Sequence, residues 1–326
     1  MGAMDVGFAV VGLGMGANRA REVAATPGAR LVAVCDLKPD RLAKVVAEHG
    51  CEGTTDYHEL LGRKDIEVIY VMTESGNHAR VAIDAARAGK HVISTKPIET
   101  TLEKADAMIR ACEQAGVKLL VDFGNRYNPE VNKLKAAVDR NLFGKLILVE
   151  ARLKWYRSDE YYDGWHGTWE LDGGGSLVNQ TVHYVDLLCW FMGPPATVRG
   201  RIGVYNHRIE AEDLAIAMLH YPNGVEGVIV CTTTFPEDYM NGIEIHGTRG
   251  AAILSKDGLS YWKTDGDVEV QVPEHPTCAA DDMVKALRHG RPLSCDGNEG
   301  LKSLALVRAV YESALDGEKL VSFRGG

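Results

Sequence analysis

The chain has 326 residues, of which 45% are hydrophobic and 25% are charged, and its formal net charge is −9 at pH 7. These values are typical of a globular protein that is long enough to form two domains. The acidic balance and the lack of a run of basic residues argue against nucleic acid or an anionic membrane surface as a partner. No apolar run approaches the roughly 18 residues that a membrane-spanning helix needs, so we expect no membrane anchor, and we expect no signal peptide.

The seven cysteines are scattered along the chain, and no two of them form a C-x-x-C pair. An odd number without such spacing argues against a disulfide framework or a zinc ribbon, so we expect free thiols and a cytoplasmic location. The sequence also lacks the H-E-x-x-H, EF-hand and P-loop patterns. We therefore expect no bound metal.

Short apolar runs alternate with helical patterns over the first 122 residues. The expected strands cover residues 7–11, 31–35, 68–72, 91–94 and 118–121. The expected helices cover residues 17–25, 39–49, 78–88 and 102–114. Because strands that alternate with helices pair in parallel, we predict an α/β domain over residues 1–122, built on a doubly wound parallel sheet with helices on both faces.

A glycine-rich turn joins the first expected strand to the first expected helix. Gly12, Gly14 and Ala17 occupy the three small positions of a G-x-G-x-x-G/A pattern. The first permits a tight turn, the second lets the main chain approach a ligand, and the third lets helix and strand pack closely. The pattern predicts a dinucleotide site of the Rossmann type, and the alternative is an ordinary strand–helix turn. The residues that would surround the pyrophosphate are Gly12, Leu13, Gly14, Met15, Gly16 and Ala17.

An acidic residue closes the second expected strand. Asp36 lies about 20 residues after the glycine pattern, where a carboxylate accepts hydrogen bonds from the ribose hydroxyl of a dinucleotide. A 2′-phosphate would meet this negative charge, so the sequence predicts NAD as the cofactor. Lys38 offers a positive charge nearby, which leaves NADP as the alternative.

Polar residues follow the next two expected strands, and ligands of open parallel sheets bind at the carboxyl ends of strands. After the third strand, Thr73 and Asn77 are placed to bond the phosphate or ribose of the cofactor. His78 either joins them or only begins the next helix. After the fourth strand comes Lys96, held by Pro97. Its ammonium either reaches both the nicotinamide ribose and a substrate hydroxyl, or it is a solvated surface lysine.

The pattern changes after residue 122, where closely spaced strands become common. We expect helices over residues 129–141, 180–191, 278–288 and 299–315. We expect strands over residues 146–155 and 319–323, and several between 197 and 272, separated by turns at 222–224, 241–242 and 257–258. Consecutive strands with short turns predict an α+β domain over residues 123–326 with a large, mostly antiparallel open sheet.

Three consecutive glycines, at positions 173–175, precede a helical pattern that carries a histidine. Such a triplet lets the main chain pass close to a flat ligand. Asn179, His183 and Asp186 share one face of the expected helix by their i, i+4 and i, i+3 spacing. The ordinary pKa of histidine suits a proton acceptor near neutral pH, and Asp186 is placed to orient the ring. We predict that His183 is a general base, and a structural histidine is the alternative.

Two further segments carry side chains that suit a sugar ring. The first contains Asn125, Arg126 and Tyr127, which either line the substrate pocket or form a salt bridge between the domains. The second is a loop rich in aromatic residues, whose faces can stack on sugars. Its candidate substrate-binding residues are Arg157, Tyr161, Trp165 and His166. The alternative for this loop is ordinary packing or an oligomer contact.

Taken together, these residues resemble the Gfo/Idh/MocA family of NAD(P)-dependent sugar and cyclitol oxidoreductases, over nearly the whole chain. The resemblance is carried by the glycine fingerprint, the Lys96-Pro97 dipeptide, residues 125–127, the glycine triplet with His183, and the closing helix near residues 299–315. It implies that Lys96 is the motif lysine and His183 the catalytic histidine. It also implies a homodimer or homotetramer, joined through the open face of the second sheet.

The chain departs from the family pattern at two positions. The usual Glu-Lys-Pro is Thr95-Lys96-Pro97 here. Many relatives carry Asp four residues before the histidine, where this chain has Asn179. An amide can orient a substrate hydroxyl but cannot accept its proton. We therefore expect Asn179 to bind substrate and His183 to act as the sole base.

The resemblance implies a dehydrogenase or reductase that acts on CH–OH groups. His183 would take the proton from a ring hydroxyl of a sugar, cyclitol or sugar nucleotide, Lys96 would stabilise the oxygen, and the hydride would pass to NAD. Two alternatives are a redox glycosidase or lyase that retains its NAD, and a non-catalytic regulator that binds a dinucleotide.

Overall fold

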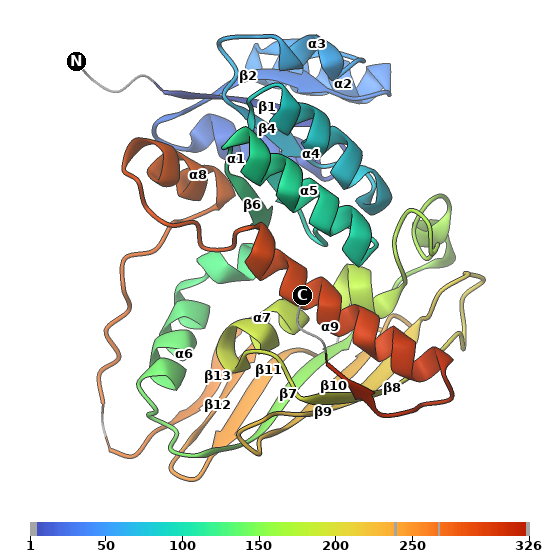
Figure 1. The fold of residues 1–326 in the computed structure, drawn as a ribbon, viewed down its shortest axis with the longest axis vertical. Helices are drawn as coiled ribbons and strands as arrows, with labels where there is room; N and C mark the ends of the chain where they lie inside the picture. Colours follow the sequence, from blue (N-terminus) through green and yellow to red (C-terminus); the bar gives the residue numbers. More distant parts are fainter. Residues whose placement is uncertain (1–4, 238–239, 267, 324–326) are drawn as a thin grey trace. The chain divides into compact units, whose positions relative to one another are not determined.

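The chain forms two compact units in the computed structural model, which describes residues 5–237, 240–266 and 268–323 (Figure 1). One unit holds the chain up to Gly124 together with Pro276–Gly300, and the other holds Asn125–His275 and the rest of the chain from Leu301. The predicted domain boundary lies at residue 122, and the first segment of the first unit ends at Gly124. The prediction did not include the later return of the chain to the first unit. The return is made by helix α8 (Ala279–Arg288), which packs on the first sheet through its buried face.

The first unit is built on a six-stranded sheet with the order β3-β2-β1-β4-β5-β6, in which every pair is parallel. Its strands are β1 (Val6–Val11), β2 (Ala29–Cys35), β3 (Glu52–Thr54), β4 (Val68–Val71), β5 (His91–Thr95) and β6 (Leu119–Asp122). This order confirms the predicted doubly wound sheet of the Rossmann type. The short edge strand β3 was not predicted, because three residues with little burial carry no apolar pattern.

Five helices connect these strands. They are α1 (Gly16–Ala25), α2 (Pro39–His49), α3 (His58–Leu61), α4 (His78–Arg87) and α5 (Leu102–Ala115). Four of them follow the predicted ranges closely, because residues next to each end of a helix signal where it starts and stops. Helix α5 begins after Thr101, whose side chain accepts a hydrogen bond from the Lys104 N–H, and ends at Gly116 in the left-handed conformation.

The second unit is built on an eight-stranded sheet with the order β13-β12-β11-β7-β10-β9-β8-β14. Its strands are β7 (Leu146–Lys154), β8 (Thr197–Gly203), β9 (Leu214–His220), β10 (Glu226–Thr232), β11 (Met240–Gly247), β12 (Ala251–Ser255), β13 (Gly258–Lys263) and β14 (Val321–Ser322). Only β7 and β10 are parallel neighbours among the described strand pairs, which confirms a mostly antiparallel sheet.

One expected turn in this sheet was wrong. Asn241 and Gly242 lie inside β11, where they pair with Leu153 and Arg152 of β7. A Cβ atom on Gly242 would come within 2.2 Å of the Leu254 carbonyl oxygen, so this glycine serves close strand packing instead of a turn. The Asn-Gly pair is a strong hairpin signal only when the chain reverses at it.

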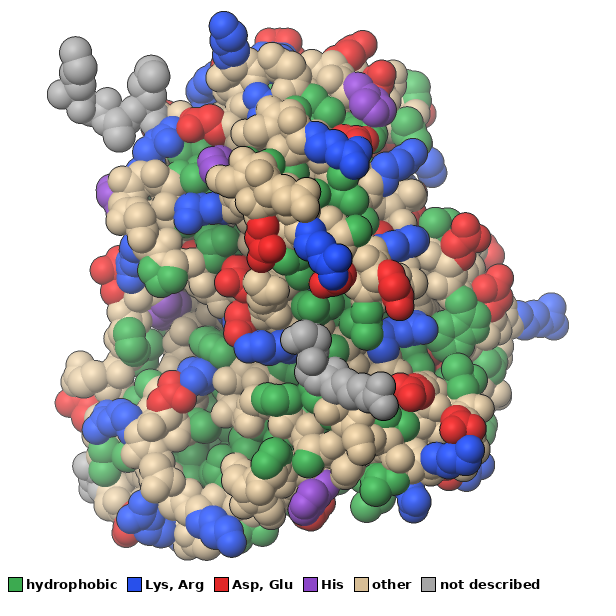
Figure 2. All heavy atoms as spheres, in the orientation of Figure 1, with side chains coloured by type: hydrophobic (Ala, Val, Ile, Leu, Met, Phe, Trp, Pro, Cys, Tyr) green, Lys and Arg blue, Asp and Glu red, His purple; other side chains and the backbone are tan. Residues whose placement is uncertain are grey.

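Three helices of the second unit lie on one side of its sheet: α6 (Pro129–Asp139), α7 (Val182–Met192) and the longer part of α9 (Gly297–Leu315) (Figure 1). Strand β9 shows the consequence, because Ala215, Ala217 and Leu219 are buried while Ile216 and Met218 are exposed. Figure 2 shows acidic and basic side chains interspersed over the face that is in view.

Candidate active site

The glycine-rich turn between β1 and α1 has the geometry that its sequence predicts. Gly12 has φ +92°, and a Cβ atom there would lie 2.6 Å from the Met72 carbonyl oxygen. A Cβ atom on Gly14 would meet only the Arg41 guanidinium, at 3.7 Å, so the main chain is open to a ligand there. The close helix–strand contact falls on Gly16, where a Cβ atom would be 3.0 Å from Met72. Ala17, to which the pattern assigned this role, is half-buried.

Asp36 braces the same turn. Its carboxylate is 8% exposed and accepts hydrogen bonds from the Leu13 N–H at 2.6 Å and the Lys38 N–H at 2.7 Å. The first bond ties the end of β2 to the glycine-rich turn, and the second fixes the rotation of the carboxylate. The carboxylate that is predicted to bind a ribose hydroxyl is therefore already oriented.

His78 connects the loops that follow β4 and β5. The ring is fully buried, with Nδ1 3.0 Å from the Pro97 carbonyl oxygen and Nε2 3.1 Å from the Thr73 carbonyl oxygen. Burial lowers the pKa of this histidine. Both ring nitrogens thus face main-chain oxygens, which supports the structural alternative over direct cofactor contact.

Sequence analysis missed a buried carboxylate beside His78. Glu99 is 0% exposed and accepts hydrogen bonds from the Ala79 N–H at 3.2 Å and the Thr100 N–H at 2.5 Å. It therefore satisfies an N–H group in the first turn of α4, which no neighbouring residue caps. A glutamate two residues after a Lys-Pro pair gives no local signal of this role.

Lys96 follows β5 and is half-buried, and its peptide bond to Pro97 is cis. Thr73 and Asn77 follow β4, where Asn77 Nδ2 donates to the Glu74 carboxylate at 3.1 Å. Because β1, β4 and β5 are neighbours and parallel, their carboxyl ends meet at one edge. The predicted cofactor-binding segments of the first unit are thus brought together.

In the second unit, His183 lies in the first turn of α7, and the turn before it is π-helical. This turn covers Ser176–Thr181 and includes Asn179. The expected regular spacing between Asn179 and His183 is therefore wrong, because a π-helical turn is wider than an α-helical one. Turns of this kind are frequent at functional sites.

Asp186, which was expected to orient His183, is bound by Arg126. The guanidinium donates to both carboxylate oxygens, at 2.9 and 2.7 Å, and lies 4.9 Å from the centre of the Trp190 ring. Both charged side chains are at most 1% exposed. The sequence left two alternatives for Arg126, which were lining the substrate pocket and forming a salt bridge between the domains. In the structure it forms a buried ion pair within one unit. Of its neighbours, Tyr127 is buried and Asn125 half-buried.

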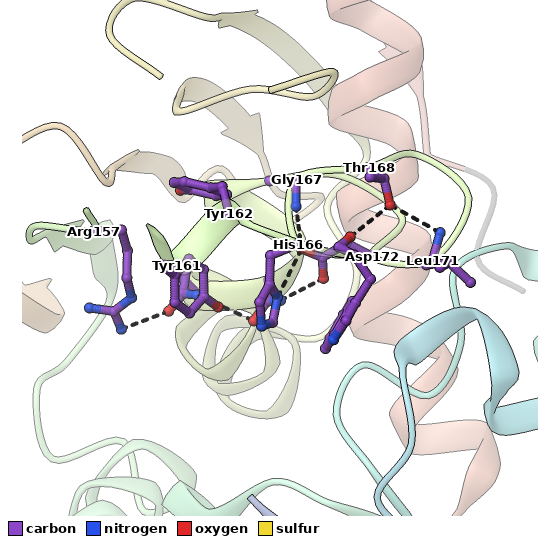
Figure 3. Close-up of polar contacts among 12 residues, drawn as sticks. Arg157, Tyr161, Tyr162, His166, Gly167, Thr168, Leu171 and Asp172 are labelled. Carbon is purple, nitrogen blue, oxygen red and sulfur yellow. Dashed lines mark hydrogen bonds and ion pairs between the residues drawn. The ribbon is translucent and has the colours of Figure 1, made fainter. Parts of the chain in front are cut away.

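The aromatic loop places His166 beside the Tyr161 ring (Figure 3), and His166 also contacts Trp165. Its imidazole stacks on Tyr161, with ring centres 4.2 Å apart, and lies 3.8 Å from the Trp165 ring. Nδ1 lies 3.1 Å from Asn179 Nδ2 and 3.5 Å from a carboxylate oxygen of Asp172. The predicted substrate-binding residues Tyr161, Trp165, His166 and Asn179 thus form one cluster.

Asp172 organises this cluster, although sequence analysis did not select it. Its carboxylate is buried, and it accepts hydrogen bonds from Asn179 Nδ2 at 2.5 Å and from the Gly167 N–H at 2.9 Å. The first bond fixes which way the Asn179 amide points. Asp172, which directly precedes the glycine triplet, thus places a buried carboxylate beside the Asn179 amide.

Arg157 is a positive charge held by aromatic rings. Its guanidinium lies 4.1 Å from the centre of the Trp155 ring and 5.2 Å from that of Tyr161. It donates to the Gln180 side-chain oxygen at 3.1 Å and to the Tyr156 carbonyl oxygen at 2.8 Å. Among the described residues it forms no ion pair with a carboxylate, so its charge is available to an anionic ligand.

Neither a metal centre nor a membrane span is found in the described parts of the chain. No group of three or more metal-binding side chains gathers in residues 5–237, 240–266 and 268–323. Within the same residues, no helix is both long and apolar enough to cross a bilayer.

Comparison with known proteins decides the family. The oxidoreductase family model with an NAD-binding Rossmann fold matches residues 6–123, and the C-terminal domain model of the same family matches residues 131–253. The chain belongs to the Gfo/Idh/MocA family. This confirms the predicted resemblance, and with it an oxidoreductase whose first domain binds NAD.

Individual members of the Gfo/Idh/MocA family match almost end to end. The inositol 2-dehydrogenase of Rhizobium meliloti is 25% identical over 96% of this chain and 98% of its own length. The WlbA dehydrogenase of Bordetella pertussis, solved with NADH and UDP-GlcNAcA, is 32% identical, with a TM-score of 0.91 and 99% of each chain covered. WlbA of Chromobacterium violaceum, solved with the same ligands, is 33% identical, with a TM-score of 0.91 over 99% of this chain and 97% of its own.

Proposed function

We propose that this oxidoreductase transfers a hydride between NAD and a ring hydroxyl of a carboxylated sugar nucleotide of the UDP-GlcNAcA class. The observation that carries the proposal is the similarity to two WlbA dehydrogenases, at 32% and 33% identity over 99% of this chain. The sugar and inositol dehydrogenases of the same family that match over similar lengths are less similar, at 25% for inositol 2-dehydrogenase and 26% for D-apiose dehydrogenase.

The charge of Arg157 supports a carboxylated substrate. A guanidinium can bind a carboxylate through two parallel hydrogen bonds, and such charge-assisted bonds are stronger than neutral ones. The rings of Trp155 and Tyr161 hold the group in place, so little side-chain entropy is lost on binding. A neutral polyol would leave this charge without an anionic partner.

For the chemical step, we assign proton acceptance to His183 and stabilisation of the reacting oxygen to Lys96. NAD, when bound, accepts the hydride from the carbon that bears the hydroxyl. The His183 imidazole takes the hydroxyl proton as that C–H bond breaks, so that a ketone forms. The Lys96 ammonium stabilises the negative charge that develops on the oxygen. We assign to Asn179, whose amide donates to Asp172, the orientation of a substrate hydroxyl.

A direct assay tests the proposal. The protein is mixed with NAD⁺ and either UDP-GlcNAcA or the neutral UDP-GlcNAc, and the absorbance of NADH is followed. We expect turnover with the acid and at least tenfold lower kcat/KM with the neutral sugar, about the effect of one lost charge-assisted hydrogen bond. Equal rates on both, or turnover only on an uncharged polyol, would remove the carboxylated substrate from the proposal.

A homodimer or homotetramer is the proposed assembly, with the open face of the second sheet as its interface. Ile216 is 42% exposed and Met218 is 62% exposed, and both point away from the helices. Light scattering on the wild type and on Met218→Asp tests this, because a charge at a buried apolar interface should dissociate it.

The seven free thiols support the proposed cytoplasmic location.

A further inference from the structure

A buried carboxylate lies beneath the glycine triplet and has no part in the chemistry assigned above. Glu212, 1% exposed, directly precedes Asp213 and strand β9. Its oxygens accept hydrogen bonds from three successive main-chain N–H groups at the start of the π-helical turn. Gly175 N–H donates to Oε2 at 2.9 Å, Ser176 N–H to the main-chain oxygen at 3.0 Å, and Leu177 N–H to Oε1 at 2.7 Å.

A tyrosine of helix α9 completes this arrangement. The Tyr311 hydroxyl donates to Glu212 Oε1 at 3.0 Å, and its side chain is buried. The same hydroxyl would lie 2.1 Å from a Cβ atom on Gly174, and the Glu212 main-chain oxygen would lie 1.9 Å from one on Gly175. Two of the three glycines are therefore required by Glu212 and Tyr311. The expectation that the triplet approaches a flat ligand is replaced by this closer explanation.

The contacts of Glu212 fix where the π-helical turn begins. Its end is fixed by the Thr181 hydroxyl, which donates to the Ser176 carbonyl oxygen at 2.9 Å. Each added residue rotates a helix by roughly 100°. Whether this turn is wide or regular therefore decides the direction of every side chain that follows it, including that of His183.

We infer that Glu212 and Tyr311 form a positioning pair, which holds the π-helical turn and through it aims Asn179 and the His183 imidazole. The inference rests on the proposed role of His183 as the base. Neither Glu212 nor Tyr311 is assigned a contact with the substrate. Their effect is on geometry, because a regular α-helical turn would rotate the histidine away from its present direction.

Three variants separate positioning from general destabilisation. Glu212→Gln replaces one of the carboxylate oxygens that accept from the Gly175 and Leu177 N–H groups by an amide NH2 group, and Tyr311→Phe removes only the hydroxyl. The matched control is Tyr221→Phe, because the Tyr221 side chain is also fully buried and its hydroxyl has no hydrogen-bond partner in the described parts of the chain. If Glu212→Gln does not fold, Tyr311→Phe carries the test.

With UDP-GlcNAcA and NAD⁺, we expect kcat to fall by roughly 10²-fold in Glu212→Gln, the effect of about 1 Å of misplacement, and by less in Tyr311→Phe. The Kd for NADH, measured by fluorescence, should stay within twofold of the wild type, because the cofactor segments lie in the other unit. Tyr221→Phe should match the wild type in both measurements. A kcat unchanged in folded Glu212→Gln and Tyr311→Phe would overturn the inference.

A second readout needs no substrate. With ¹³C-labelled histidine, the ring signal of His183 is assigned by its loss in His183→Ala. We expect its chemical shift and its titration midpoint to move in Tyr311→Phe and Glu212→Gln, but not in Tyr221→Phe. An unmoved His183 signal in the folded variants would refute the positioning pair even if no substrate is turned over. Absent turnover of UDP-GlcNAcA by the wild type would count against the proposed function alone.

Discussion

The cofactor segments of the first unit and the side-chain cluster of the second unit are built in different ways. At the edge of the first sheet, main-chain groups of the glycine-rich turn are exposed to a ligand, and residues that follow the neighbouring strands support them. Asp36 bonds the glycine-rich turn, and Gly12 and Gly16 fit against Met72. In the second unit, the cluster consists of side chains brought from distant segments, from Arg157 to Tyr311.

This difference has a physical cause and a functional consequence. A dinucleotide phosphate is recognised by N–H groups at a helix start, so any member of a family can reuse the same short turn. A sugar is recognised by the positions of individual polar side chains, which several elements must supply. We therefore expect changes in the first unit to alter cofactor affinity, and changes in the second to alter the sugar step.

The largest effect is expected from His183→Ala. Loss of a general base lowers kcat by roughly 10²–10⁴-fold. If the cofactor segments and the side-chain cluster act separately, the Kd for NADH should not change. Steady-state kinetics with UDP-GlcNAcA and fluorescence titration of NADH check the two parts. A variant with wild-type kcat would exclude His183 as the base.

The next effect concerns Glu212 and the pH dependence of stability. Burial raises the pKa of Glu212 from 4.5 to about 7, so the folded protein holds this proton more tightly than the unfolded chain. The stabilisation is complete below the unfolded pKa and is lost as pH rises through the folded one. The free energy of unfolding should therefore fall by about 3 kcal/mol, from this group alone, as pH rises from the unfolded to the folded pKa.

Glu212→Gln should remove that part of the pH dependence. Urea unfolding of the wild type and the variant at pH values from 4.5 to 8 measures the difference in their unfolding free energies. We expect the difference to change in favour of the variant as pH rises. Parallel curves for the two proteins would show that Glu212 does not titrate in this range.

Arg157→Gln should raise the KM for UDP-GlcNAcA by about 10- to 100-fold, because a charge-assisted hydrogen bond is worth about 1.5–3 kcal/mol. Arg157→Lys keeps the charge but loses the paired hydrogen bonds, so it should recover only part of the loss. Neither variant should change the affinity for NADH. An equal loss on UDP-GlcNAc would mean that Arg157 acts in packing and not on a carboxylate.

Asn179→Asp tests why this chain lacks the usual acid. The new carboxylate would face Asp172, which is 2.5 Å from Asn179 Nδ2 now, and two like charges at that distance cannot both ionise easily. We expect a loss of about 1–3 kcal/mol of stability at neutral pH, most of it regained at acidic pH. The double change with Asp172→Asn exchanges acid and amide and should restore stability, which calorimetry would show.

The smallest effect is expected in the first unit, from Asp36→Asn. The amide oxygen can still accept the Leu13 N–H, while the bond from the Lys38 N–H is lost, so the link between β2 and the turn should survive. Loss of the charge should weaken the discrimination against NADP by about tenfold, one lost charge interaction, while kcat with NAD changes little. Paired titrations with NADH and NADPH measure the ratio. A ratio that does not move would assign the cofactor preference to another residue.

The sequence by itself determined the alternation of strands and helices in the first unit. Strands that are buried on both faces are short continuous apolar runs, and helix ends carry capping residues, so both are visible in short segments. It also determined the family, through Gly12, Gly14, Lys96 and His183. Local signals misled where a distant partner decides the outcome. The Asn241-Gly242 pair reads as a turn but is held in β11 by its neighbours.

Only the tertiary structure decided what surrounds the proposed base. Helical spacing selects Asp186 as a neighbour of His183, but it gives no sign of Arg126, which binds Asp186 from sixty positions earlier in the chain. Gly174 and Gly175 leave room for Tyr311 and Glu212, which lie far along the chain. Helical spacing describes neighbours along one element, whereas charge pairing and close packing join elements that meet only when the chain has folded.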